Sequence, residues 1–456
     1  MAIETISWKL SEFAYNLKLK NVPERVVSKA KLHVLDTAGI MMAACNLEIV
    51  KKVVKVCKLL CGPPESTVIG HGLKLGACNA ALANATMAHS TDYDDTHLGS
   101  VHQSCMAVPT AFAVAESVNA SGREALEALI VAYEVCARLG LVAPKAYHAH
   151  CWHPTPVIGV FGSALTAGKL MGLTVEQLAW ALGIAGSLAS GIGQTVVEGV
   201  PVKPMHPGFA AHAGIMSSLL AKEGLKGPYQ IFEGRNGFFN AYLRGEKLDI
   251  EQAVSGLGER WETLNMSLKP YPSCHATHSA IDAAIILKKK YDLRLEDIEE
   301  CTYYLPKSWV SIGERWKVDT AYGAKFSLPY CVIVALKKGR VSLEDFADDA
   351  IRDVEVTKHL TKVKAVPNES YDSEEYRGKL VIPAKAKIRT KDGKLYEEEV
   401  VDHKGTPCNP MTEDEVIAKF MCNIESSKFK GLTDEVINRI LNLENHSVEE
   451  VMHYLR

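Results

Sequence analysis

Several signatures that would place the sequence in a special class are absent. No run of about 18 or more apolar residues occurs, so no segment resembles a transmembrane helix. The N-terminal MAIETISWKLSEF lacks the basic start and apolar core of a signal peptide. The formal net charge of −3 gives no reason to expect nucleic acid or an anionic membrane as a partner. We therefore expect a cytoplasmic protein with no nucleic-acid or membrane partner.

Cysteine is present, but not in the spacing that binds metal. None of the twelve cysteines lies in a CxxC pair, and the nearest two in sequence, Cys57 and Cys61, are one helical turn apart. Structural zinc sites and iron–sulfur clusters use tighter groups of ligands. The surroundings are mainly apolar, which is typical of reduced, buried thiols in a reducing compartment. We therefore expect no zinc ribbon and no iron–sulfur cluster.

The first 266 residues have the pattern of helices with small side chains on their faces. The chain of 456 residues, 47% of them apolar, has room for two or three ordinary domains. Ala81 and Ala85 lie at helical spacing, and Thr174 with Gln177 forms a capping-box pattern at a helix start. Small faces allow helices to approach closely, within a bundle or across a subunit interface. We expect a tightly packed helical bundle and a homodimer.

The pattern changes after Met266. Two helical segments follow, at 280–291 and 327–337. Three strand-like segments lie at 299–305, 380–390 and 395–401. Asp392-Gly393 separates the last two segments and is typical of a hairpin turn. Residues 408–456 are again helical in pattern. The predicted fold class is mostly α, with an all-helical domain of residues 1–266 and 408–456. A smaller α+β domain of residues 267–407 is inserted near the C-terminus.

A cluster of acidic and histidine residues follows the Ala-rich helical segment. Asp92, Asp94 and Asp95 fall within four residues, and Thr96, His97 and His102 come directly after them. Like charges beside a buried helix repel one another unless something pairs with them. A chain tolerates this cost most readily where the residues perform chemistry. A solvated loop or a magnesium site are the ordinary alternatives.

Three further stretches place polar residues where a packed helical protein has no need of them. They are Cys151–Thr155 with His153, Lys203–Ala211 with Lys203 and His206, and Lys269–His278 with Lys269 and Cys274. The first lies at a helix start, where backbone N–H groups favour carboxylates. The last lies at the junction of the predicted domains, where small-ligand sites commonly form.

Together these side chains suit proton transfer beside a substrate carboxylate. A fixed cation can stabilise the resulting carbanion without a metal. Each residue alone has an ordinary explanation: His153 as a core or capping histidine, Lys203 as a surface charge, Cys274 as a buried thiol. Only their occurrence together favours a catalytic site.

The sequence resembles the MmgE/PrpD family, which includes 2-methylcitrate dehydratases, cis-aconitate decarboxylases and iminodisuccinate epimerases. The resemblance covers nearly the whole chain and rests on ordered motifs: His89–His97, Trp152–Thr155, Gly183–Ser187, Lys203–His206, Glu233–Arg235, Lys269–Pro272 and Phe326–Tyr330. It implies a large all-helical domain, a smaller α+β lid, a homodimer and an active site between the domains. It also implies a cofactor-free reaction on a small di- or tricarboxylate.

The resemblance also extends to single site positions. Active-site positions of the decarboxylase branch match those of this chain at Asp92, Thr96, His102, His153 and Lys203. A further histidine of that branch falls at Cys274, where dehydratase-like relatives can carry cysteine. The dehydratases in turn have a longer insertion than the Leu98–Val101 segment found here, and a proline at Gln103.

The leading hypothesis is a cofactor-independent dehydratase of a small hydroxy-polycarboxylate such as 2-methylcitrate. His102 is the candidate for proton transfer, with Asp92 orienting it. Lys203 and His153 are expected to bind the substrate carboxylate and oxyanion. The expected substrate-binding residues are Thr96, Lys269, Cys274 and His206.

Three rival functions remain open. Two are decarboxylation of cis-aconitate and epimerisation of an amino- or imino-dicarboxylate within the same family. The third is a magnesium-dependent, all-helical prenyl-diphosphate enzyme that uses DYDD as its metal motif. It requires a second Asp-rich motif on a facing helix, and Asp348-Asp349 is the only later Asp pair.

Overall fold

The computed structural model describes residues 4–60, 62–99, 101–198, 200–373, 376, 382–425 and 427–456. The chain forms two compact units. The larger comprises Met1–Ser90, Asp94–Met266 and Thr412–Arg456, and the smaller comprises Thr91–Tyr93 and Ser267–Met411. Three residues of the acidic segment therefore belong to the smaller unit. The domain limits given above stay a prediction.

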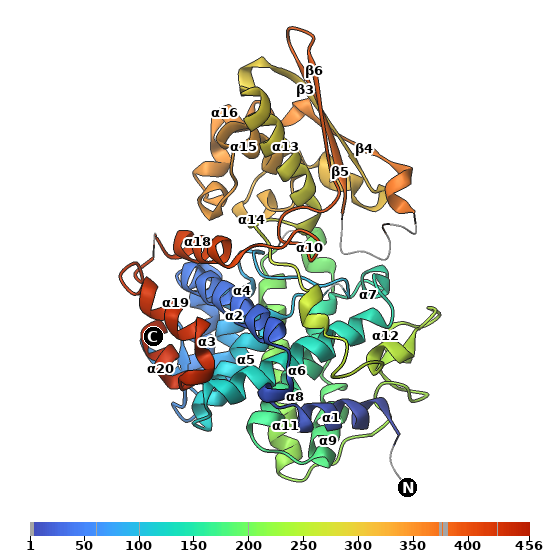
Figure 1. The fold of residues 1–456 in the computed structure, drawn as a ribbon, viewed down its shortest axis with the longest axis vertical. Helices are drawn as coiled ribbons and strands as arrows, with labels where there is room; N and C mark the ends of the chain where they lie inside the picture. The colour runs from blue at the N-terminus through green and yellow to red at the C-terminus, as the bar shows by residue number, and fades with distance from the viewer. Residues whose placement is uncertain are drawn as a thin grey trace. The chain divides into compact units, whose positions relative to one another are not determined.

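The larger unit is built almost entirely of helices (Figure 1). Its described α-helices are α1 (Ile6–Asn16), α2 (Glu24–Ala44), α3 (Glu48–Leu60), α4 (Ala77–His89), α5 (Ser104–Ser117), α6 (Gly122–Leu141), α7 (Ala146–Ala149), α8 (Pro154–Leu170), α9 (Val175–Ala185), α10 (Gln194–Glu198), α11 (His206–Lys222), α12 (Phe238–Tyr242), α18 (Glu413–Ile424), α19 (Thr433–Leu441) and α20 (Val448–Leu455). A short antiparallel pair, β1 (Ser66–Val68) and β2 (Leu73–Leu75), lies between α3 and α4 in the sequence. The Thr174–Gln177 capping box is confirmed at the start of α9.

Small residues allow the central helices to pack closely. A Cβ atom on Gly214 of α11 would lie 2.4 Å from the Cβ of Ser163 on α8, and one on Gly162 would lie 2.3 Å from the Sγ of Cys136 on α6. Larger side chains would therefore force these helices apart. The small helix faces predicted from the sequence allow close helix–helix packing within the larger unit. The homodimer stays a prediction.

The smaller unit combines helices with a four-stranded mixed sheet. Its described α-helices are α13 (His278–Tyr291), α14 (Ala321–Ala324), α15 (Leu328–Lys338) and α16 (Val354–Thr357). The strand order is β4-β3-β5-β6, with β3 (Ile298–Leu305) parallel to β4 (Val363–Pro367) and antiparallel to β5 (Ala384–Thr390). β6 (Leu395–Val400) pairs antiparallel with β5 through the predicted hairpin, where Gly393 has a φ of 84° that favours glycine. Residues 380 and 381 of the predicted strand lie outside the described residues.

The core of the smaller unit lies between its helices and the sheet. Buried side chains of α13 and α15 pack with inward-facing residues of β3 and β5, among them Ile281, Leu336, Tyr303 and Ile388. The alternating burial along β3 gives this strand one core face. The predicted mostly helical fold is confirmed, and the four-stranded sheet of the smaller unit is mixed. β4 was missed by the sequence analysis.

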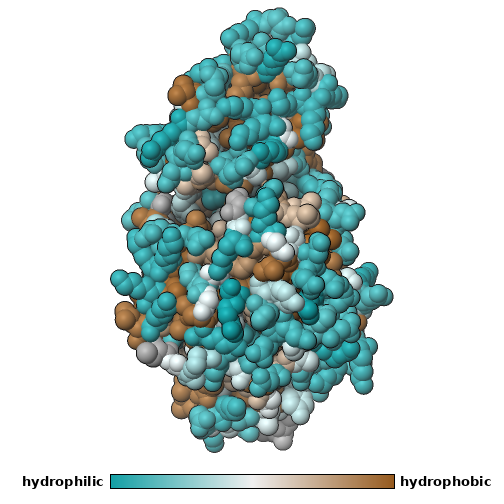
Figure 2. Space-filling model, turned by 90° about the vertical axis from the view of Figure 1, so that its left-hand side faces the viewer, coloured by the Kyte–Doolittle hydropathy of each residue, from teal (hydrophilic) through white to brown (hydrophobic). Residues whose placement is uncertain are grey.

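The surface gives no sign of a bilayer-spanning segment. Within the described parts of the chain, none of the helices combines the length and apolar composition needed to cross a membrane. The face shown in Figure 2 is largely hydrophilic, and its apolar residues form several small patches.

Candidate active site

The acidic segment contributes two carboxylates to the larger unit, and each pairs with a buried histidine. The Asp94 carboxylate lies 2.8 Å from Nδ1 of His89, at the end of α4. The Asp95 carboxylate lies 2.9 Å from Nδ1 of His33 on α2. Asp95 also accepts hydrogen bonds from the backbone N–H groups of Gln103 and Ser104 at the start of α5, each at 3.0 Å. These contacts compensate the burial of the two carboxylates.

His102 is held in place by the same segment. Its Nδ1 lies 2.6 Å from the backbone carbonyl oxygen of Asp95, so Nδ1 carries the proton and donates it. Its backbone N–H donates to the Oγ1 of Thr155 on α8 at 3.1 Å. The Asp94 carboxylate lies 3.9 Å from Nδ1 of this ring. In the neutral ring, Nε2 is then the basic nitrogen.

His153 and His206 form a buried pair at two helix starts. His153 precedes the first residue of α8, and His206 is the first residue of α11. Their Nδ1 atoms are 3.0 Å apart, so one ring donates and the other accepts. The backbone N–H of His153 also donates to the carbonyl of Gly191 at 2.9 Å. Cys151, two residues earlier, has a φ of 64°, an uncommon conformation for a non-glycine residue.

Lys203 places a positive charge near this pair. It is the first residue of the 3-10 turn Lys203–Met205 that leads into α11, and only 7% of it is exposed. Burial, assisted by the Lys203 charge, holds the pKa of His153 well below its usual range. Burial, His89 and Lys203 lower the pKa of His206 to about 4. Both rings are therefore neutral at pH 7, and Lys203 supplies positive charge for an anionic ligand.

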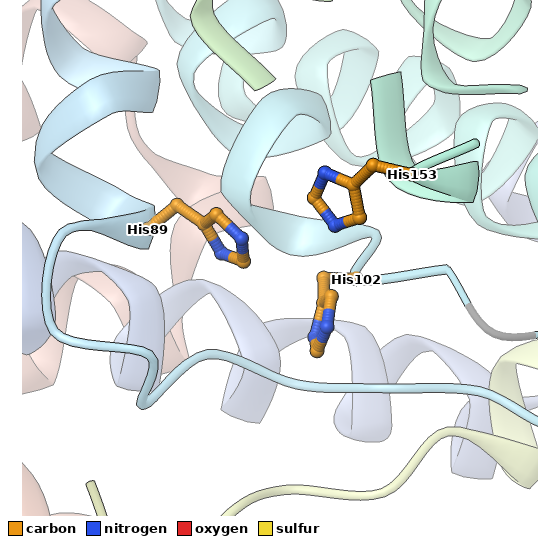
Figure 3. Close-up of side chains that lie close together, drawn as sticks. All are labelled: His89, His102 and His153. Atoms are coloured by element: carbon orange, nitrogen blue, oxygen red, sulfur yellow. The ribbon is translucent and has the colours of Figure 1, made fainter. Parts of the chain in front are cut away.

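Figure 3 shows the rings of His89, His102 and His153 facing one common space from three separate elements. Ring centroids are 5.0 Å apart for His89 and His102, 5.7 Å for His89 and His153, and 6.2 Å for His102 and His153. His89 and His153 are 1% and 4% exposed. The side chain of His102 is 15% exposed, so this three-histidine cluster is reached by solvent at one ring. The cluster offers several proton donors and acceptors at one place.

The smaller unit carries a second group of predicted site residues. The Lys269 ammonium lies 3.1 Å from the Asp92 carboxylate and donates to the Asp92 carbonyl at 2.8 Å. Asp92 has a φ of 53°, which turns its backbone at this point. The backbone N–H of Cys274 donates to the carbonyl of Lys325 at 2.8 Å, and the Lys325 ammonium donates to the carbonyl of Pro272 at 2.9 Å.

The structure thus divides the predicted site residues between two groups. His102, His153, His206 and Lys203 lie in the larger unit, and Asp92, Lys269 and Cys274 lie in the smaller unit. Thr96 is buried in the larger unit, next to Asp95 in the chain. The catalytic and binding roles given to these residues, including the orientation of His102 by Asp92, stay predictions.

Sequence reasoning assigned no individual role to four residues that shape these groups. His89 was noted only as part of a family motif, although it lies only five positions before its partner Asp94 in the chain. His33 and Lys325 gave no signal, because each meets its partners through the tertiary fold. Asp95 was noted only as one charge of the cluster.

The acidic segment does not present a free set of magnesium ligands. Asp92 pairs with Lys269, Asp94 with His89, and Asp95 with His33 and the start of α5. A metal ion would have to replace these contacts. The arrangement therefore gives no support to the prenyl-diphosphate alternative.

Lys325 predicts an unusual dependence of stability on pH. Burial lowers its pKa from 10.5 to about 7, against the opposing effect of Asp92. Between these values the unfolded chain holds a proton that the folded chain has lost, so the free energy of unfolding rises with pH. We expect this group to add up to about 4 kcal/mol from pH 7 to pH 10. Urea unfolding at both pH values should show the increase, and the increase should be smaller by this amount in Lys325→Met. An equal increase in the variant would contradict the assignment.

Comparisons with known proteins bear on both units. Residues 8–251 match the family model described as MmgE/PrpD N-terminal domain, and residues 271–443 match MmgE/PrpD C-terminal domain. Cis-aconitate decarboxylase from Aspergillus terreus is 27% identical over 466 residues, covering 96% of this chain and 93% of the relative. The enzyme of that name from Mus musculus is 26% identical, with 98% and 92% covered. The Homo sapiens enzyme is 25% identical, with 98% and 93% covered.

Proposed function

We propose that this chain, which belongs to the MmgE/PrpD family, is a cofactor-independent lyase of a small tricarboxylate, with cis-aconitate as the leading substrate. Its relatives over nearly the full length are enzymes named cis-aconitate decarboxylase, which are lyases. At 25–27% identity this likeness supports a lyase and leaves the individual substrate to be tested. Dehydration of 2-methylcitrate, which the sequence analysis put first, has no such support from the comparisons and becomes the second candidate.

One observation carries the proposal: His102 and His153 converge in the larger unit, and the Lys203 charge acts on His153. The neutral rings of His153 and His206 near the buried Lys203 ammonium suit a polyanionic substrate better than a neutral one. The first turn of α8, directly after His153, adds backbone N–H groups that favour a carboxylate. These features hold a substrate carboxylate without requiring a metal ion.

The proposed chemistry is decarboxylation with proton return. Cleavage of a carbon–carbon bond releases carbon dioxide and leaves its electron pair on an allylic carbanion of the substrate. The Lys203 ammonium and the imidazole of His153 stabilise the negative charge that spreads to the neighbouring carboxylate. His102 enters this step protonated on both ring nitrogens. Its Nε2 proton is transferred to the carbanion carbon, which leaves the neutral ring, and His102 regains a proton from solvent. The bond between Nδ1 of His102 and the Asp95 carbonyl holds the ring in orientation during both steps.

The remaining predicted residues are proposed to bind substrate. Thr96 donates a hydrogen bond, and His206 fixes the ring of its partner His153. Lys269 and Cys274 are assigned to a lid formed by the smaller unit, and Asp92 holds Lys269 in place. These roles rest on the family resemblance and on local contacts.

Cys274 favours the second candidate function, dehydration of a hydroxy-tricarboxylate. The decarboxylase branch has histidine at this position, and dehydratase-like relatives can carry cysteine. In that reaction His102 removes a proton beside a carboxylate, the carbon–oxygen bond breaks, and the hydroxyl leaves as water after protonation. Epimerisation of an amino- or imino-dicarboxylate uses the same proton removal, followed by proton return from the other face.

Product identity distinguishes these reactions. Purified protein would be incubated separately with cis-aconitate, 2-methylcitrate, citrate and an aspartate-type dicarboxylate, and the products followed by proton NMR. We expect a terminal methylene signal and released carbon dioxide from cis-aconitate. A new vinyl signal from a hydroxy acid would identify the dehydratase, and inversion without a change of formula the epimerase. No turnover of any of the four compounds would contradict the proposed substrate class.

We also propose that the protein is a cytoplasmic homodimer. Apolar side chains around α10 and α11 are unusually exposed: Ile192 at 58%, Val197 at 73%, Phe209 at 40% and Leu219 at 42%. Exposed apolar groups of this kind favour contact with another protein surface. Light scattering should give twice the 49.8 kDa mass of the chain. A monomeric mass at micromolar concentration would contradict the dimer.

A further inference from the structure

We propose that His89, His102 and His153 also bind a divalent transition-metal ion, with Zn²⁺ as the best fit, and that the bound ion excludes the substrate. One nitrogen of each ring lies within 4.8 Å of the others (Figure 3). Four-coordinate zinc with Zn–N distances of about 2.0–2.1 Å needs nitrogens about 3.3 Å apart. The rings therefore have to approach by at most about 1.5 Å.

Two of these rings present a buried nitrogen with no hydrogen-bond partner. Nε2 of His89 and Nε2 of His153 are both inaccessible to solvent and unpaired. Leaving a buried polar atom unpaired is unfavourable. A metal ion between the rings would use both nitrogens as ligands. The cost of the unpaired atoms would then be offset by two coordinate bonds.

The other nitrogen of each ring already has the partner that metal-binding histidines usually have. Nδ1 of His89 bonds to the Asp94 carboxylate, and Nδ1 of His102 bonds to the Asp95 carbonyl. Nδ1 of His153 bonds to His206. Such partners fix the orientation of the ring and direct its second nitrogen to the metal. All three Nε2 atoms can therefore serve as ligands while these bonds stay in place.

A second possible ligand group, formed by His89, Asp94 and Cys105, fits a metal less well. Asp94 already accepts from His89, and the Cys105 thiol donates to the His102 carbonyl at 3.2 Å. Coordination there would break both bonds. The positive charge of Lys203 weakens either site, whereas the Asp94 carboxylate behind His89 strengthens the three-histidine site.

Metal and substrate compete because they use the same rings. His102 and His153 are the proton-transfer and carboxylate-binding groups of the proposed function, and this part of the inference rests on that function. With three protein ligands, Zn²⁺ would keep one open position for water. Zinc would then be a reversible inhibitor of a reaction that does not need it.

Metal binding can be measured without any substrate. Chelator-treated protein would be titrated with Zn²⁺ against a colorimetric zinc chelator, and with Co²⁺ while its visible absorption is recorded. We expect one zinc per chain, an affinity loss of more than 100-fold in His89→Ala and a loss of about 10–100-fold in Asp94→Asn. His212→Ala, on α11, is the matched control and should bind as the unchanged protein does. Circular dichroism would verify that each variant is folded.

Three results would overturn the metal site. They are no stoichiometric binding by the folded protein, unchanged affinity in His89→Ala, and a sulfur-to-cobalt charge-transfer band that disappears in Cys105→Ala. Zn²⁺ should also raise the apparent KM of the tricarboxylate and leave kcat unchanged. If turnover required zinc, the proposal that the bound ion excludes the substrate would be overturned. Turnover without zinc binding contradicts this inference alone. Zinc binding without turnover supports the metal site and contradicts only the proposed function.

Discussion

His102→Ala should lower kcat for cis-aconitate by about 10²–10⁴, the usual effect of losing a positioned acid–base group. The substitution removes the only proton-transfer group that the proposed mechanism uses. It leaves Lys203 and the His153–His206 pair in place, so substrate binding should change much less than kcat. Steady-state kinetics would separate the two effects.

Two further variants make this result specific. His212→Ala removes a histidine from α11, outside the site, and should keep the full rate. His102→Gln retains a polar side chain that can donate to the Asp95 carbonyl but cannot act as a general acid or base. A rate close to that of the unchanged protein in folded His102→Gln would contradict the proton-transfer role.

Lys269→Met should destabilise the smaller unit by about 3–5 kcal/mol. The ammonium and the Asp92 carboxylate are 1% and 3% exposed, and their atoms lie 3.1 Å apart. Removing the cation leaves a buried carboxylate without its partner, which costs more than the pair itself contributes. Chemical unfolding followed by circular dichroism would measure the loss.

The double variant Asp92→Asn/Lys269→Met tests the cause. With both charges removed, most of the lost stability should return, because no unpaired charge remains. Lys364→Met, which breaks the exposed pair with Glu300, should cost far less. A double variant as unstable as the single variant would show that the Lys269 stem, rather than its charge, is what matters.

Much of the fold could be predicted because its signals are local. The capping box at Thr174 and the hairpin at Asp392-Gly393 each depend on a few neighbouring residues. The small helix faces predicted close packing, and Gly214 shows it in the structure. Strand β4 was missed because its five residues become a strand only by pairing with β3, more than 50 residues earlier. Such pairing leaves little trace in the strand's own sequence.

The residue types of the candidate site were predicted from the sequence. The pairings between its carboxylates and histidines were not. The motif indicated a set of carboxylates and histidines, but not that Asp94 pairs with His89 and Asp95 with His33. Asp92 has a left-handed backbone and belongs to the smaller unit, where it pairs with Lys269. Asp94 and Asp95 belong to the larger unit and pair with histidines there. The pairing of Asp95 with His33 joins residues 62 positions apart. Contacts of this kind follow from tertiary structure and have no local sequence pattern.

The most direct test of the account is proton NMR of cis-aconitate with metal-depleted protein in deuterated water. The account predicts carbon dioxide release, a terminal methylene signal and one deuterium at the carbon that receives the proton from His102. This deuterated product should fall by at least 100-fold in His102→Ala. If the metal-depleted, folded protein leaves cis-aconitate unchanged, or becomes active only when metal is restored, the proposal of a cofactor-independent cis-aconitate lyase is contradicted.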